Sequence, residues 1–253
     1  MLKRVIIFVH ISGGLGNQLF QIANVLDLIV AAKSNKTCKI VFLYTGNPLL
    51  NKAHEFPRLQ DLGIKSFCLK GHVSKWIIRF LKVLGMFQLS NMLVEGRSTE
   101  SKLRNGLNFV EGLYQKQPSR VVTRFFNRKL KLKFPKDKYS VLHIRLGDYL
   151  SKESQKNVGL VSDSFYQLSL KALQQFGYPI WVVSDGTQTQ IAKILSGCDV
   201  PYQVKSSEAD LKDLEFIANA HSVAICNSTF SLWACYLRQR EKVIYPLTWF
   251  PAK

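Results

Sequence analysis

Two polar side chains, His143 and Arg145, interrupt an apolar segment, residues 141–146, that leads into Gly147 and Asp148. Alternate residues of a strand share a face, so this spacing places the imidazole beside the guanidinium at the carboxyl end of a strand. Ligands of open α/β sheets bind at that edge, and a guanidinium holds an anion through two N–H donors at once. We therefore predict a ligand site here. The alternative is an arginine neutralised by a nearby carboxylate, with the histidine packed beside it.

A glycine-rich turn is the second candidate site. Gly14, Gly16 and Asn17 follow an apolar run and open a predicted helix. The dinucleotide-binding pattern Gly-x-Gly-x-x-Gly fails because its third glycine would fall on Leu19, and no Gly-Lys-Ser/Thr follows, which excludes a nucleotide-hydrolysing P-loop. What remains is a tight turn that lets a ligand approach a helix N-terminus, or a turn needed only for packing.

Further candidates follow predicted strands in the second half of the chain. Ser228 and Thr229 stand where residues 222–226 turn into a helix, so their hydroxyls and the free backbone amides could bind a phosphate or cap the helix. Asp185 follows the predicted strand 180–184 and is a candidate contact to a nucleoside.

Three segments, in their order along the chain, resemble the α1,2-fucosyltransferases of glycosyltransferase family 11 in their bacterial form. They are residues 12–21 (SGGLGNQLFQ), 143–149 (HIRLGDY) and 227–233 (NSTFSLW), with weaker echoes at 112–115 and 249–250. Bacterial members often read His-x-Arg-Arg-Gly-Asp-Tyr, and Leu146 replaces the second arginine here.

The resemblance implies an α/β fold of two Rossmann-like domains facing a cleft (GT-B type) and an inverting transfer of L-fucose. The donor would be GDP-β-L-fucose, and the acceptor the 2-hydroxyl of a sugar, galactose above all, on an oligosaccharide or lipid-linked surface glycan such as O-antigen. Arg145 would stabilise the charge that grows on the leaving diphosphate, and His143 would orient Arg145 or touch the donor. The glycine turn would lie near the donor. Asp213 would read guanine; the alternative is a solvated helix carboxylate.

An inverting transfer also needs a base that removes the acceptor proton on the face opposite the diphosphate. Asp148 and Glu153 are the nearest candidates, just beyond Arg145. Asp148 could instead pair with Arg145 or cap the loop. No Asp-x-Asp metal motif is present, so neither a metal nor another cofactor is expected.

Hydrophobic periodicity predicts the elements that position these residues. The first half starts β-α-β, with strands at 5–11, 39–44 and 66–69 and helices at 17–32 and 73–87. We expect an acceptor-side domain over 1–138 and a GDP-fucose-binding domain over 139–253, divided at the basic interval 124–138. The second domain alternates like a parallel doubly wound sheet, with strands at 140–146, 180–184, 202–204, 222–226 and 242–245 and helices at 163–175, 187–195, 210–220 and 229–240.

The positive charge is concentrated in the first half. Residues 1–138 hold 24 Lys and Arg against 7 Asp and Glu, while residues 139–253 hold 11 against 10. The basic residues are dispersed and no nucleic-acid-binding motif is present, so we expect no nucleic-acid partner. Attraction to an anionic membrane or to phosphate-bearing acceptors fits. The helix 73–87 could lie on such a membrane, but its apolar residues cover a broad arc that better suits a domain core.

The five cysteines show no pairing pattern, which favours reduced thiols and a cytoplasmic protein, with contact to the inner face of the membrane left open. The apolar start lacks a cleavage site and fits a first strand. Two other functions stay open: a related transferase with a different linkage or nucleotide sugar, and a basic non-catalytic protein that binds nucleic acid or anionic lipid.

Overall fold

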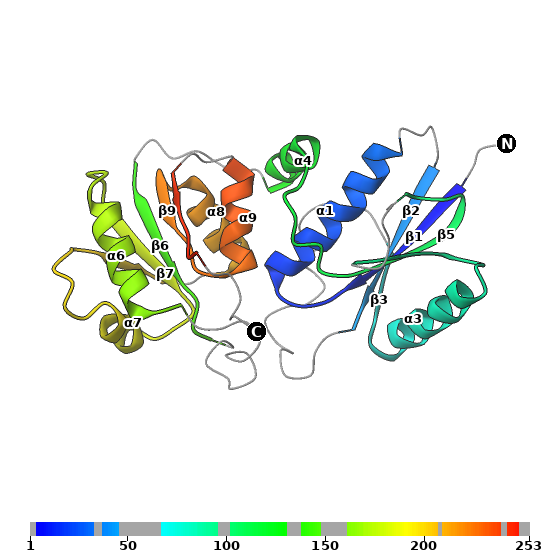
Figure 1. Cartoon of the computed structure of the whole chain (residues 1–253), viewed down its shortest axis with the longest axis horizontal. Coiled ribbons are helices and arrows are strands. Elements are labelled where there is room, and N and C mark those ends of the chain that lie inside the picture. The colour runs from blue at the N-terminus through cyan, green and yellow to red at the C-terminus, as the bar shows by residue number, and fades with distance from the viewer. Residues whose placement is uncertain are drawn as a thin grey trace. The chain divides into compact units, whose positions relative to one another are not determined.

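The computed structural model describes residues 4–32, 37–45, 67–95, 102–130, 138–147, 161–206, 209–238 and 242–247. The chain divides into two compact units, Met1–Lys129 and Leu130–Lys253. Each unit contains one sheet of five parallel strands with helices on both of its faces (Figure 1). The predicted α/β class is therefore confirmed.

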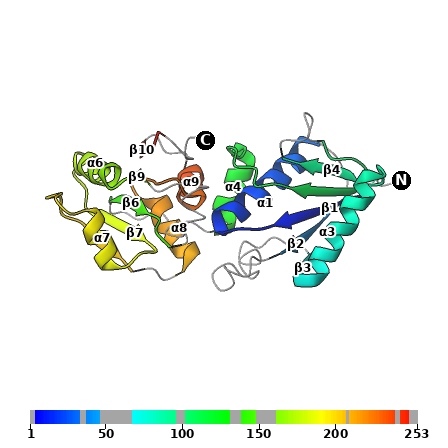
Figure 2. The same cartoon turned by 60° about the horizontal axis from the view of Figure 1, so that its bottom comes forward.

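The sheet of the first unit has the strand order β3-β2-β1-β5-β4. Helices α1 and α4 cover one face and α3 covers the other (Figures 1 and 2). Because both faces are covered, β1 is apolar almost throughout. The strands are β1 (Arg4–Ile11), β2 (Thr37–Tyr44), β3 (Phe67–Lys70), β4 (Asn91–Val94) and β5 (Gly106–Glu111), and the helices are α1 (Leu15–Ala31), α3 (Gly71–Met86) and α4 (Arg120–Leu130).

The sheet of the second unit has the order β10-β9-β6-β7-β8. Counted from its own first strand this is 3-2-1-4-5, the order of Rossmann folds. Helices α6 and α7 lie on one face, and α8 and α9 on the other (Figure 1). The strands are β6 (Ser140–Ile144), β7 (Ile180–Ser184), β8 (Gln203–Lys205), β9 (Ser222–Ala224) and β10 (Val243–Ile244), and the helices are α6 (Asp163–Gln174), α7 (Gln188–Ile194), α8 (Asp210–Asn219) and α9 (Thr229–Arg238).

Helix α3 departs from the expected packing. Its buried residues are Ser74, Ile78 and Leu81, while Trp76 is 73% exposed and Phe80 55% exposed. The prediction that the apolar arc of this helix serves the core is therefore wrong for its two largest side chains. No helix in the described ranges is long and apolar enough to cross a membrane.

Candidate functional site

The predicted site segments lie beside the strand-order reversal of each sheet. In the second unit the strand order reverses between β6 and β9, and open α/β sheets bind ligands at the carboxyl ends of such a pair. Residues 145–147 follow β6, and residues 227–229 lead from β9 into α9. In the first unit the reversal lies between β1 and β5, and the glycine turn follows β1. The topology therefore places three motifs that are distant in sequence at ligand-binding edges.

Arg145 is joined to Asp185 at the edge of the second sheet. Its Nη1 lies 2.8 Å from Asp185 Oδ2, and both side chains are about a third exposed, at 28% and 30%. The other carboxylate oxygen, Oδ1, accepts from the Leu146 amide at 2.7 Å. Asp185 thus fixes both the guanidinium and the backbone that carries it. The structure brings together two predicted site residues that lie on adjacent strands, and the guanidinium remains accessible to a ligand.

Two glycines pack closely against the residues of this edge. A Cβ on Gly147 would collide with the Asp185 carboxylate, and one on Gly186 with the Leu146 side chain. Leu146 is 6% exposed and belongs to the core of the unit. The residue that departs from the bacterial pattern is therefore a packing residue here.

His143 is buried beneath the edge. Its Nδ1 lies 3.4 Å from Cys226 Sγ, and its ring packs against that of Phe230 with centroids 5.8 Å apart. Burial, assisted by the Arg145 charge, lowers the pKa of His143 to about 4, so the imidazole is neutral near pH 7. Burial likewise raises the pKa of Cys226 to about 12, which leaves it a thiol. The pair is a neutral contact within the core, below the exposed end of Arg145.

Asp213 lies in the first turn of α8 and is 6% exposed. Lys205 Nζ lies 2.9 Å from its Oδ1. The carboxylate is therefore buried and ion-paired, so the alternative of a solvated helix carboxylate is wrong. Ser228 is buried, and its carbonyl accepts the Leu232 amide at 3.0 Å, which places it at the start of α9.

The glycine turn of the first unit is held by amide side chains. Gln18 Nε2 donates to the Gly13 carbonyl at 2.9 Å, and the Ser12 amide donates to Gln21 at 3.1 Å. Gly13 has a φ of +76°, and a Cβ there would lie 2.7 Å from Asn17 Nδ2. The turn therefore requires glycine for both its backbone conformation and the space that Asn17 occupies.

The second motif of this unit reaches the same turn. Gln115 Nε2 donates to Asn17 Oδ1 at 3.3 Å, and Tyr114 Oη donates to the Leu93 carbonyl at 2.6 Å. Burial and the nearby carboxylates raise the pKa of Tyr114 to about 12. The segment that follows β5 thus contacts the start of α1.

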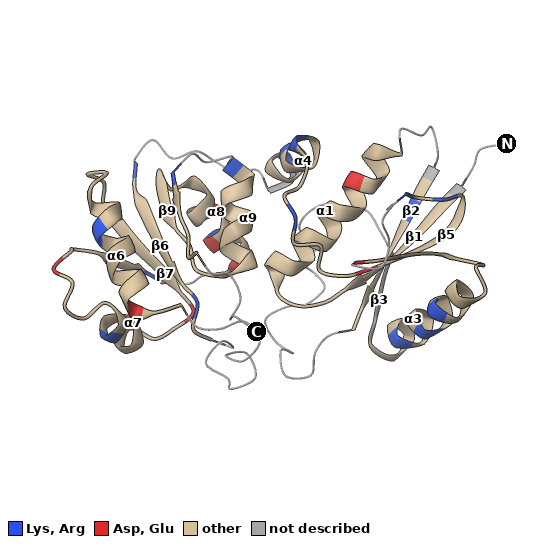
Figure 3. Cartoon of the chain, in the orientation of Figure 1, with Lys and Arg blue, Asp and Glu red and all other residues tan. Residues whose placement is uncertain are grey.

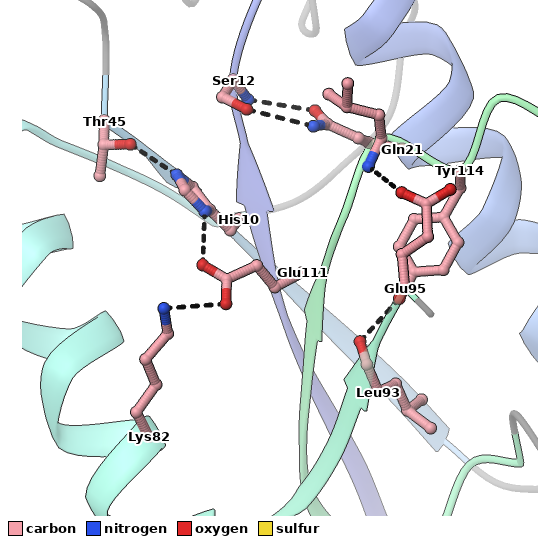
Figure 4. A network of polar contacts seen from close by, with 10 residues as sticks. His10, Ser12, Gln21, Thr45, Lys82, Leu93, Glu95, Glu111 and Tyr114 are labelled. Atoms are coloured by element: carbon pink, nitrogen blue, oxygen red, sulfur yellow. Dashed lines mark hydrogen bonds and ion pairs between the residues drawn. The ribbon is translucent and has the colours of Figure 1, made fainter. Parts of the chain in front are cut away.

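A further polar cluster at this edge was not predicted (Figure 4). His10 near the end of β1 contacts Glu111 at the end of β5 and Thr45 just after β2, and Lys82 of α3 contacts the same Glu111. A polar residue near the end of an apolar strand was the signal used for His143, and it applies equally to His10. Glu111 could not be found in this way because β5 itself was not predicted.

Some predicted positions lie outside the described residues: Asp148, Glu153 and the Trp249–Phe250 pair. Within the described ranges, no three His, Cys, Asp or Glu side chains are grouped so as to hold a metal ion.

Known proteins resemble this chain over most of its length. The model of glycosyl transferase family 11 matches residues 118–251. An α-1,2-colitosyltransferase from Escherichia coli is 24% identical over 277 residues, covering 97% of this chain and 92% of that protein. The fucosyltransferase NodZ from Bradyrhizobium has a TM-score of 0.54 at 13% identity, covering 92% of this chain and 93% of NodZ.

The E. coli heptosyltransferase WaaC with ADP-2-deoxy-2-fluoro heptose has a TM-score of 0.50 at 12% identity, covering 99% of this chain and 90% of WaaC. These structural likenesses show a shared GT-B fold. Since the family model spans more than half of the chain, the protein belongs to glycosyl transferase family 11.

Proposed function

We propose that the protein transfers L-fucose, or a closely related L-sugar, from a GDP donor to the 2-hydroxyl of an acceptor sugar with inversion. One observation carries the proposal: Arg145 stands partly exposed at the carboxyl end of β6, beside the strand-order reversal, with its guanidinium fixed by Asp185. A fixed cation at that edge suits a leaving diphosphate, on which negative charge grows as the sugar departs.

In this proposal the second unit binds the donor. Arg145 binds the β-phosphate, and the amides at the start of α9, with Ser228 and Thr229, bind the diphosphate as a helix N-terminus does. Asp213 is proposed to read guanine through N1–H and N2–H. Its ion pair with Lys205 supports this role, because it holds the carboxylate in a buried position where the oxygens act as acceptors.

Two closely related donor sugars, L-fucose and colitose, fit the proposal. The relative from E. coli is named for α-1,2 transfer of colitose, which is L-fucose without its 3-hydroxyl. A site that hydrogen-bonds a hydroxyl discriminates strongly against an analogue that lacks it, whereas an apolar pocket discriminates weakly. The two GDP-sugars therefore have to be compared directly, and we propose the 1,2 linkage for either.

The first unit is proposed to hold the acceptor, a galactoside or lipid-linked glycan. The contact between Asn17 and Gln115 gives this unit a polar edge beside the start of α1. Amide side chains that donate and accept are suited to sugar hydroxyls.

A donor and acceptor screen tests the proposal. The protein is incubated with GDP-L-fucose, GDP-L-colitose, GDP-mannose or UDP-galactose and a β-galactoside acceptor, and the linkage of the product is assigned by NMR. We expect an α1,2-linked product from GDP-fucose or GDP-colitose only. Transfer from UDP-galactose or GDP-mannose alone, or another linkage, would overturn the assignment.

Helix α3 supports a second proposal, that the first unit docks on an anionic membrane. Val73, Trp76, Phe80, Val83 and Phe87 recur at intervals of three and four residues and are all exposed, from 47% for Val83 to 73% for Trp76. The buried residues Ile78 and Leu81 lie on a different face. The helix therefore carries an outward apolar stripe in addition to its core-facing one.

Charge identifies the surface that this stripe fits. The exposed Lys75 and Arg79 lie on α3, which carries no acidic residue (Figure 3). Aromatic side chains beside cations suit the boundary between acyl chains and anionic headgroups. We therefore propose a peripheral contact that holds the enzyme near lipid-linked acceptors on the cytoplasmic face.

A further inference from the structure

The geometry points to His10 as the general base that removes the proton from the acceptor hydroxyl, with Glu111 as its positioning residue. This inference rests on the proposed function, because it assigns the proton acceptor of that reaction. His10, Glu111 and Thr45 come from the carboxyl ends of three adjacent strands, β1, β5 and β2. They form a chain of carboxylate, imidazole and hydroxyl at the ligand-binding edge of the first sheet (Figure 4).

The partners of the two ring nitrogens indicate the tautomer that this proposal requires. His10 Nδ1 lies 3.1 Å from Glu111 Oε1, and Nε2 lies 2.5 Å from Thr45 Oγ1. An ionised carboxylate only accepts, so Nδ1 carries the proton and Nε2 offers its lone pair to the hydroxyl. An imidazole oriented by a carboxylate and aimed at an alcohol is the arrangement that general-base catalysis requires.

The remaining contacts hold this arrangement in place. Lys82 Nζ binds the second oxygen of Glu111 at 2.9 Å, so both carboxylate oxygens are engaged. His10 and Glu111 are 21% and 23% exposed, so the imidazole is rigidly held and still reachable. Among the described residues, Glu111 of β5 is the charged group that contacts His10, and Lys82 of α3 contacts that carboxylate.

In the proposed step the acceptor 2-hydroxyl takes the place of the Thr45 hydroxyl against Nε2. As its oxygen bonds to C1 of the donor sugar, its proton passes to Nε2, and the electron pair of the breaking C1–O bond leaves on the β-phosphate of GDP. The imidazolium is stabilised by Glu111 and later returns its proton to water.

Three variants test the assignment: His10→Gln, Glu111→Gln and Thr45→Val, with His72→Gln on the exposed start of α3 as the matched control. The values of kcat and of KM for the acceptor are measured from about pH 5 to about pH 9, and GDP binding is measured as a control for folding. We expect His10→Gln to lower kcat by about 10²- to 10⁴-fold with GDP binding retained. The fall of wild-type activity on the acidic side should be absent from that variant.

The other variants separate catalysis from packing. In Glu111→Gln the acidic limb should move to lower pH, because a neutral amide no longer stabilises the imidazolium. Thr45→Val should retain the fall of activity at acidic pH, because in the proposed step the proton passes to His10 and not to Thr45. If His10→Gln does not fold, the assignment is tested by the shift of the pH–activity profile in Glu111→Gln.

Two outcomes lead to different conclusions. Transfer by His10→Gln within about tenfold of wild type, with its acidic limb intact, would overturn the inference and leave the base among other residues. A wild-type enzyme that transfers no sugar from any GDP donor would instead count against the proposed function.

Discussion

Asp185 Oδ2 lies 2.8 Å from Arg145 Nη1 across two adjacent strands of the second sheet. The other oxygen of the same carboxylate holds the Leu146 amide, so Asp185 sets the position of both the guanidinium and its backbone. A partly exposed ion pair of this kind contributes about 0 to 1 kcal/mol to folding. We therefore expect this ion pair to orient the guanidinium more than to stabilise the fold.

Replacing Arg145 by lysine should abolish most transfer while the fold is kept. Lysine keeps the charge but lacks the planar fork that binds two phosphate oxygens, so we expect kcat to fall by about 10²-fold or more. Steady-state kinetics with the best GDP-sugar measure this, and Arg124→Lys on the exposed face of α4 is the control. Turnover near that of the control would show that Arg145 does not bind the leaving group.

Asp185→Asn should lower kcat about tenfold or more and leave the melting temperature within about 4 °C of wild type. The amide no longer neutralises and aligns the guanidinium, although the backbone contact to Leu146 persists through its oxygen. Kinetics and thermal unfolding are measured on the same sample. A large loss of stability with normal kcat would show that the pair stabilises the fold and does not act in catalysis.

Transfer should survive EDTA. In the proposed site the diphosphate is neutralised by Arg145 and the start of α9, so no metal charge is required. Assays with and without the chelator, followed by Mg²⁺ or Mn²⁺, check this. Loss of activity that either ion restores would reveal a metal requirement.

The buried neutral His143 predicts a pH dependence of stability. Its pKa is about 4 in the folded protein and about 6.5 in the unfolded chain, so between these values the unfolded state binds the extra proton. Above that window the residue contributes no pH dependence. Within it, stability falls on acidification by at most about 1.4 kcal/mol per pH unit.

Chemical denaturation of wild type and His143→Gln across this window measures the contribution. The difference between the two slopes belongs to His143, because the other groups titrate in both proteins. Parallel curves would indicate that the imidazole is protonated in the folded state.

The outward stripe of α3 predicts salt-sensitive vesicle binding. Each basic residue near an anionic surface contributes about 1 kcal/mol, and salt screens that attraction. Trp76→Ser and the double variant Lys75→Gln, Arg79→Gln should each weaken sedimentation with phosphatidylglycerol vesicles, with activity on a soluble acceptor retained. Lys82 is left intact because it holds Glu111. Failure of wild type to bind at low salt would exclude membrane docking.

The sequence predicted those elements whose own residues show a regular apolar pattern. The strands and helices of the second unit lie within a few residues of their expected ends, and Arg145 lies at a strand end as expected. Strand β5 was missed because Asn108 stands in its centre. That buried amide is satisfied by the nearby Arg104 backbone and by the Asn91 side chain, which only the fold brings near.

Helix α4 was missed because the basic interval 124–138 was interpreted as the boundary between the two domains. Val122 and Phe126 are buried beneath its cationic surface, and Ser119 Oγ accepts the Val122 amide at its start. The pairing of Arg145 with Asp185 was also beyond the sequence, since it depends on the register of β6 against β7. Spacing along the chain identifies strand ends but not which of them are neighbours.

The place of β1 in its sheet has a consequence for synthesis of the protein. β1 pairs with β5, which begins at Gly106. One edge of this central strand therefore stays unpaired until most of the unit has left the ribosome. At about 5 to 20 residues per second this delay is about 5 to 20 s. During that time a highly apolar strand presents unpaired N–H and C=O groups to other chains. Nascent molecules of this enzyme should therefore depend on chaperones more than its modest size suggests, and His10 meets Glu111 only after that interval ends.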